Sequence, residues 1–370
     1  MDIERTTAII SLGKIWDNCK IIKSIISPQC HIMAVVKANA YGHGSVVVAK
    51  YLEKKGINLF FVACLSEAIE LRQAGIEGEI LIHCPSDIRK MHLLWKYNLT
   101  QTVATYRYAK ILNELGKPIK IHLKIDTGMS RIGFYCHYNE DINITLHEIK
   151  KVSKLPNIKV CGVFTHFAES DNDNRSFTEK QFSNYTRITH ELMIAGVDLG
   201  IRHCCNSTAI IKYPHMHLDM VRPGIMLYGL VPVKTLLPFK PSMELKSVIV
   251  QINDLNLGDT VSYGRTYLVQ KNKKIAIVAI GYADGYFRLL SNKDSVLVKG
   301  QRAPIVGRIC MDTCMIDVTD INVATGDVVT IFGKDNGQFK EITEMSDIIG
   351  TINYELLCAV NKRVRRVYCK

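Results

Sequence analysis

The chain has 370 residues, of which 47% are hydrophobic and 22% are charged. This balance is typical of a globular protein and excludes a disordered, collagen-like or low-complexity chain. Lysine and arginine residues give a net charge of +12, but they are spread along the chain apart from two short runs at 271–274 and 362–366. No zinc-finger, RNP or Walker motif accompanies them, so we expect no nucleic-acid partner.

The sequence also indicates the cellular compartment in which the protein is expected. No apolar run approaches the ~18–20 residues that a transmembrane helix needs. The N-terminal segment contains Asp2 and Glu4 and lacks the apolar stretch of a signal peptide. Twelve cysteines are scattered from Cys19 to Cys369 without a CxxC pair, which is typical of reduced thiols. We therefore expect a cytoplasmic protein with no membrane partner.

Short apolar, β-branched runs recur between residues 30 and 230, each followed by a stretch with helical spacing. The runs are HIMAVVK (31–37), LFFVACL (59–65), EILIH (79–83), LTQTVAT (99–105), IKIHLKI (119–125), IKVCGVFTH (158–166), GIRHCCN (200–206) and HLDMV (217–221). Strands that alternate with helices predict βαβ units and a parallel sheet. Eight such units predict an α/β fold built on a (β/α)8 TIM-like barrel.

The pattern changes after residue 234. The stretch PFKPS (238–242) is typical of a linker, and beyond it short strand-like runs are separated by Gly, Asp and Asn turns. We predict a barrel domain over residues 1–236 and a mostly β C-terminal domain over residues 237–370. The first ten or so residues could join the β-domain.

The first barrel run ends in Lys37, within AVVKANAYGHG. Active residues of such barrels lie at the C-terminal ends of the strands. A lysine that follows a buried strand and precedes a Gly-containing loop is partly desolvated and can form a Schiff base. A lone lysine is more often a surface residue whose stem lies along apolar surface, but the surrounding string favours the reactive interpretation.

That string resembles the pyridoxal-phosphate lysine signature of the alanine racemase family. Further strings follow in the family's order: HLKIDTGMSRIGF (122–134), GVFTHFAESD (162–171), HCCNSTA (203–209), RPGIMLYG (222–229), VSYGRTY (261–267), IGYADGY (280–286), GRICMD (307–312) and IGTINYELLC (349–358). The resemblance covers both predicted domains. It implies an isomerase that racemises alanine with pyridoxal 5'-phosphate as cofactor and supplies D-alanine for peptidoglycan.

The resemblance also implies roles for four residues. Lys37 would bind the cofactor covalently and act as base on the D-enantiomer, and Tyr263 would be the second base, acting on the L-enantiomer. Arg222 would face the pyridine nitrogen. Because a guanidinium cannot accept a proton, it would leave this nitrogen unprotonated and suppress transamination. His166 would connect Arg222 to the Tyr263 side.

Other matching positions imply binding roles. The cofactor phosphate would be held by residues of the late barrel strands, where barrel phosphate sites usually form, and by two tyrosines. These residues are Asn206, Ser207, Gly224, Ile225, Tyr41 and Tyr354. Arg131 would bind the phenolic oxygen of the cofactor and the substrate carboxylate. The remaining positions are Met311 and Tyr282 for substrate, and Lys124 as a site of possible carbamylation.

In the family, the tyrosine base and the Met311 position reach the active site of a partner subunit, which implies a homodimer with shared sites. No metal site is expected, since the strings at 203–205, 215–217 and 310–314 lack paired ligand spacing.

Four alternatives remain open. They are a serine-preferring or broader racemase, a non-catalytic pyridoxal-phosphate carrier, a barrel decarboxylase and a nucleic-acid binder. The carrier usually lacks the β-domain and the second base. The decarboxylase usually has an acid at the Arg222 position.

Overall fold

The computed structural model describes residues 3–370, which form two compact units. The barrel unit comprises residues 15–40 and 45–240. The β-unit comprises residues 3–14, 41–44 and 241–370. The segment 41–44, which closely follows the first barrel strand, therefore packs within the β-unit. A functional boundary near residue 236 stays a prediction.

The barrel unit contains a parallel barrel, which confirms the predicted α/β fold. Each of the eight predicted runs contains a strand. The strands are β2 (His31–Ile32), β3 (Ala34–Val35), β4 (Leu59–Val62), β5 (Glu79–Ile82), β6 (Thr100–Val103), β7 (Ile119–Asp126), β9 (Ile158–Phe164), β10 (Ile201–His203) and β11 (Met220–Val221). β2 and β3 are one strand interrupted at Met33, and they close the barrel because β2 pairs with β11 and β3 pairs with β4. A short extra strand, β8 (Phe134–Tyr135), pairs with β7.

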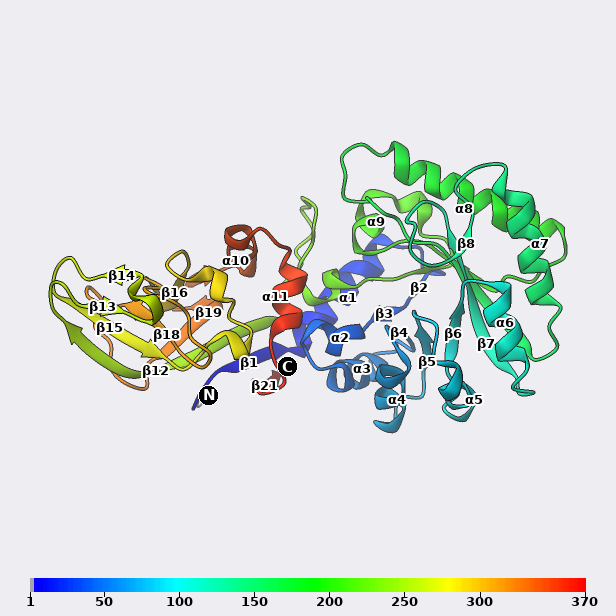
Figure 1. Ribbon diagram of the computed structural model, residues 1–370. Helices are drawn as coiled ribbons and strands as arrows, with labels where there is room; N and C mark the ends of the chain where they lie inside the picture. The colour runs from blue at the N-terminus through cyan, green and yellow to red at the C-terminus, as the bar shows by residue number, and fades with distance from the viewer. Residues whose placement is uncertain (1–2) are drawn as a thin grey trace. The chain divides into compact units, whose positions relative to one another are not determined.

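Helices lie outside these strands (Figure 1). They are α1 (Leu12–Ile25), α3 (Ser45–Lys54), α4 (Leu65–Gln73), α5 (His92–Lys96), α6 (Tyr106–Asn113), α7 (Asp141–Ser153), α8 (Ser176–Ile194) and α9 (Ser207–Lys212). Each turns a buried apolar face to the barrel, as Val48, Ala49 and Leu52 do on α3. Among residues 3–370, no helix is both long enough and apolar enough to cross a membrane.

The β-unit is mostly antiparallel sheet, which confirms the predicted β character of the C-terminal part. Its strands are β1 (Thr7–Ser11), β12 (Met243–Leu255), β13 (Thr260–Val261), β14 (Tyr267–Leu268), β15 (Lys273–Val278), β16 (Ser295–Val298), β17 (Gln301–Pro304), β18 (Cys314–Asp317), β19 (Val328–Asp335), β20 (Gln338–Lys340) and β21 (Arg365–Cys369). β1 pairs with both β12 and β21. Two helices, α10 (Ile342–Ile349) and α11 (Asn353–Ala359), complete the unit.

A buried ion pair lies in the core of the β-unit. The Nζ of Lys340 lies 2.7 and 2.8 Å from the two carboxylate oxygens of Asp294, and the Tyr286 hydroxyl donates to the same carboxylate at 2.8 Å. Neither the lysine nor the tyrosine is exposed to solvent. Loss of one partner would therefore leave the other charge desolvated and uncompensated.

We predict that Lys340→Met lowers the free energy of unfolding by about 3–5 kcal/mol, because Asp294 would stay buried without its cation. Lys299→Met is the control, since Lys299 pairs with Asp327 at the surface and such pairs contribute about 0–1 kcal/mol. Urea unfolding followed by circular dichroism measures both. Equal losses in the two variants would contradict the prediction.

Candidate active site

Four cationic side chains gather at the C-terminal end of the barrel. Lys37 follows β3, Lys124 is on β7, Arg131 lies in the loop after β7, and Arg222 follows β11. Such a group of cations is costly without anions nearby, so this end of the barrel suits a ligand with several negative charges.

The pKa values of two nearby histidines are lowered by the positive charges of these cations. Burial lowers the pKa of His83, and the charges of Arg131, Lys37, Lys124 and Arg222 lower it further, to about 3. Burial and the same four charges hold the pKa of His166 well below its ordinary value. Both imidazoles are therefore neutral at physiological pH and can accept or donate hydrogen bonds.

The backbone directly after Lys37 is left-handed. Residues 38–41 have φ values between 50° and 55° although none of them is glycine. This conformation costs about 1–2 kcal/mol per L-residue, so the surrounding structure must hold it. Asn39 contributes, because its side-chain oxygen accepts a hydrogen bond from the Ser45 N–H at 2.9 Å. Runs of this kind concentrate at functional sites.

Glu67, in the first turn of α4, also holds this turn. One carboxylate oxygen accepts a hydrogen bond from the Ala38 N–H and the other accepts one from the Ala63 N–H, both at 2.7 Å. The residue after Lys37 is thus tied to the loop that follows β4. Charge-assisted bonds of this kind are among the stronger ones in proteins.

The guanidinium of Arg222 is fixed by several neighbours. Nη1 donates to Nδ1 of His203 at 2.7 Å. Nη2 donates to the carbonyl oxygens of Thr165 and Cys204, at 2.9 and 3.1 Å, and lies 3.3 Å from Nδ1 of His166. The predicted neighbours Arg222 and His166 are therefore in contact.

Lys124 is almost fully buried. Burial and the charge of Arg222 lower its pKa from 10.5 to about 7, and Asp126 counteracts this only in part. At neutral pH, Lys124 is therefore far more often a neutral amine than an ordinary exposed lysine is. A neutral amine is the form that reacts with CO2.

Asp126, at the end of β7, shapes the loop that carries Arg131. Its Oδ1 accepts hydrogen bonds from the N–H groups of residues 128–130, and its Oδ2 accepts one from the Arg131 N–H at 2.9 Å. His137 contacts the same carboxylate at 3.0 Å. Arg131 itself is exposed, so this backbone cradle sets where its side chain begins.

Four residues predicted for phosphate binding lie together in the barrel unit. Asn206 caps α9 through a hydrogen bond from the Ala209 N–H at 3.0 Å. The Ser207 hydroxyl accepts a bond from the Gly224 N–H at 2.9 Å, which joins the start of α9 to the start of the 3-10 helix η3 (Ile225–Tyr228). The structure thus brings Asn206, Ser207, Gly224 and Ile225 to one place.

The other predicted residues lie in the β-unit. The Tyr41 and Tyr354 rings form an edge-to-face pair with centroids 6.1 Å apart. Tyr263, Tyr282 and Met311 are exposed by 69%, 43% and 52%. Their loops adjoin, because the Ser262 hydroxyl donates to the Arg308 carbonyl at 2.5 Å and the Tyr282 N–H donates to the Cys310 carbonyl at 3.0 Å. Such a set of exposed apolar side chains is typical of a contact surface.

Sequence reasoning missed four residues of this site: His83, Glu67, Asp126 and His203. Three of them stand at or near the ends of predicted strand runs, which was a usable signal. No such sequence signal pointed to Glu67, because an acidic residue in the first turn of a helix is common.

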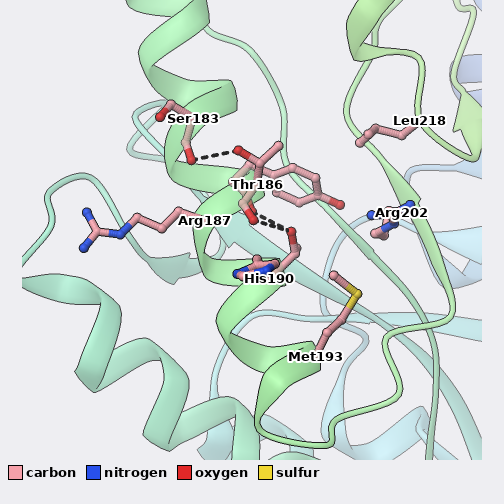
Figure 2. A pocket seen from close by; sticks show the side chains of 9 residues that line it. Ser183, Thr186, Arg187, His190, Met193, Arg202 and Leu218 are labelled. Carbon is pink, nitrogen blue, oxygen red and sulfur yellow. Dashed lines mark hydrogen bonds between the residues drawn. The ribbon is translucent and has the colours of Figure 1, made fainter.

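A pocket of about 450 Å³ lies elsewhere in the barrel unit, between α8 and the segment after β10. Figure 2 shows His190 and Met193 of α8 on one side of it and Arg202 opposite, whereas the side chain of Arg187, another lining residue, extends away. Its arginines already have partners, since Arg202 pairs with Asp219 and Arg187 donates to Asn139. No predicted site residue lines this pocket. Nowhere in residues 3–370 do three or more His, Cys, Asp and Glu side chains form a group that could hold a metal ion.

Known proteins match this chain over nearly its whole length. Residues 10–232 match the model of the alanine racemase N-terminal domain and residues 242–368 that of the C-terminal domain. The alanine racemase of Methanococcus maripaludis is 46% identical, with 98% of both chains covered. The structure of Clostridium difficile alanine racemase has a TM-score of 0.92 at 40% identity, covering 99% of this chain and 96% of that one. The Bartonella henselae alanine racemase, solved with covalently bound pyridoxal phosphate, has a TM-score of 0.88 at 26% identity, with 99% of both chains covered. The chain therefore belongs to the alanine racemase family of isomerases.

Proposed function

We propose that this enzyme interconverts L-alanine and D-alanine with pyridoxal 5'-phosphate as cofactor. The observation that carries the proposal is the group of Lys37, Lys124, Arg131 and Arg222 around one end of the barrel. Pyridoxal phosphate has a phosphate and a phenolic oxygen, and the substrate has a carboxylate, so these anionic ligands suit the positive charge of this group. The Bartonella henselae neighbour holds this cofactor covalently, which supports the same assignment here.

The donors present fit the cofactor. The Ser207 hydroxyl accepts from the Gly224 N–H and can still donate its own hydrogen to a phosphate. Arg131 offers a guanidinium to the phenolic oxygen or to the substrate carboxylate. Nδ1 of His83 is a buried polar atom for which residues 3–370 provide no hydrogen-bond partner. We propose Asn206, Gly224, Ile225, Tyr41 and Tyr354 as the further cofactor contacts.

Two bases are needed, one for each face of Cα. When bound, the cofactor withdraws the electron pair that remains at Cα after the proton leaves. Lys37 would remove or return the proton on the face presented by D-alanine, and Tyr263 on the face presented by L-alanine. The left-handed turn after Lys37 would fix the direction of its amine. Arg222 and His166 would orient the groups around the pyridine ring, with Met311 and Tyr282 at the substrate.

We also propose that two chains share each site. Tyr263, Tyr282 and Met311 form an exposed surface on the β-unit, which a second copy would cover. A cytoplasmic location and a role in supplying D-alanine for peptidoglycan complete the proposal. Buried cysteine thiols such as Cys19, Cys204 and Cys314 support a reducing compartment.

The assignment is tested by incubating the purified chain and pyridoxal phosphate with L-alanine and measuring D-alanine with a chiral assay. We expect D-alanine from the wild type and none from Lys37→Ala, because the latter lacks both the cofactor link and one base. Serine serves as the second substrate. A protein that binds the cofactor but racemises neither amino acid would favour the carrier alternative.

Tyr263→Phe tests the second base. We expect racemisation to fall by about 10²–10⁴-fold, the usual contribution of a positioned acid or base. In D2O, exchange of the Cα proton of D-alanine should persist because Lys37 still reaches it. Tyr267→Phe, four residues further along, is the control and should keep wild-type rates. Full activity in Tyr263→Phe would rule out the two-base scheme.

Lys124 is proposed to be carbamylated. At a fixed concentration of dissolved CO2, we expect a carbamate signal in ¹³C NMR with labelled bicarbonate that grows as the pH rises through about 7, where the amine loses its proton. Lys124→Met should abolish the signal and Lys159→Met, at an exposed lysine, should keep it. A signal that survives in Lys124→Met would assign the carbamate elsewhere.

A further inference from the structure

Four polar side chains form a continuous chain of contacts inside the barrel. Nη1 of Arg222 donates to Nδ1 of His203 at 2.7 Å, and Nε2 of His203 lies 2.9 Å from Nδ1 of His122. Nε2 of His122 lies 3.4 Å from Oε1 of Glu79. This chain of contacts starts with Arg222 after β11, passes through β10 and β7, and ends at the first residue of β5. It therefore leads from the site residue Arg222 to the opposite end of the barrel.

Arg222 fixes the direction of every proton in this chain. A guanidinium only donates, so Nδ1 of His203 must accept and carry no proton. A neutral His203 then carries its proton on Nε2 and donates it to Nδ1 of His122. His122 in turn carries its proton on Nε2, which lies 3.4 Å from the Glu79 carboxylate but makes no hydrogen bond within residues 3–370. Burial, together with the charge of Arg222, holds the pKa of His203 well below its ordinary value, which agrees with a neutral ring.

The barrel makes room for His122 in particular. Gly162 on β9 lies beside it, and a Cβ at Gly162 would come within 2.5–2.7 Å of three atoms of the imidazole ring. The pairing of β7 with β9 also shifts its register between Ile121 and His122. Irregular pairing of this kind re-aims side chains and is frequent near active sites. The ring of Phe164 stacks on His203, with centroids 4.8 Å apart, and holds the second imidazole in place.

The last residue in this chain of contacts, Glu79, carries a charged carboxylate. Burial alone would raise its pKa, but the contact with His122 and the charge of Lys120 lower the pKa below its ordinary value. Its side chain keeps 29% of its surface exposed. At 3.4 Å the contact with His122 is electrostatic rather than a short hydrogen bond. It still favours the tautomer of His122 with the proton on Nε2.

We propose that His122 and Glu79 are positioning residues that hold His203 in its Nε2–H tautomer and thereby fix the guanidinium of Arg222. Without them, His203 could adopt the other tautomer, whose Nδ1–H would face the Arg222 donor and repel it. The catalytic consequence rests on the proposed function, because Arg222 is assigned to the cofactor ring there. The tautomer of His203 itself is expected in the protein both with and without the cofactor.

The test is ¹⁵N NMR of the full-length chain labelled at histidine, with and without added pyridoxal phosphate. The shifts of Nδ1 and Nε2 report the tautomer, and the His203 and His122 signals are assigned by their loss in His203→Asn and His122→Asn. In the wild type we expect both rings as the Nε2–H tautomer. Glu79→Leu and Gly162→Ala should give mixed tautomers at His203, whereas Glu79→Gln, which keeps an acceptor oxygen, should restore the wild-type signals.

Kinetics add a second readout. Weaker orientation of Arg222, comparable in free energy to the loss of one hydrogen bond, should lower kcat about fivefold for both directions of racemisation. KM should stay nearly unchanged. Glu179→Leu is the matched control, because Glu179 contacts His215 at 3.3 Å on the outside of the barrel. This variant should change neither the His203 signals nor kcat.

Three results decide between the possibilities. Wild-type His203 signals in Glu79→Leu would overturn the positioning role. Mixed tautomers with unchanged kcat would overturn its catalytic consequence. A wild-type chain that shows the expected tautomers and racemises no amino acid would leave the contact chain standing and refute the proposed function.

Discussion

The positive charge of Arg222 is buried and finds no carboxylate partner within residues 3–370, and the arrangement of the barrel end follows from this. A buried charge is costly unless hydrogen bonds compensate it. Here two carbonyl oxygens and two neutral imidazoles accept from the guanidinium. Such acceptors stabilise the charge without neutralising it. The field of Arg222 therefore extends to its neighbours, where it helps to keep His166 and His203 neutral and to lower the pKa of Lys124.

The two nearby carboxylates are held by backbone N–H groups, and Asp126 offsets the positive field at Lys124 only in part. Glu67 accepts from two backbone N–H groups, and Asp126 accepts from four and contacts His137. Both organise the loops that carry Lys37 and Arg131 through hydrogen bonds from backbone N–H groups. Loop geometry and electrostatics are thus supported by the same residues.

The architecture and much of the site could be predicted from sequence. The eight apolar runs predicted the barrel strands because burial on both faces of a parallel strand leaves a local hydrophobic signature. The order of the motif strings predicted family membership. They also pointed to Lys37, Arg222 and His166, which the structure collects at one end of the barrel. Tyr263 and Met311 lie in the β-unit, and the roles of all five residues remain proposals.

What the sequence determined by itself was local: strand and helix positions, the change to β structure after residue 234, and the reactive residues at strand ends. Tertiary structure alone decided which side chains meet. His122 and His203 are 81 residues apart, and Gly162 leaves space for a ring that belongs to another strand. The left-handed turn after Lys37 depends on Glu67, from a different βα unit. No local pattern encodes such contacts, because they arise only when the closing barrel brings distant strands side by side.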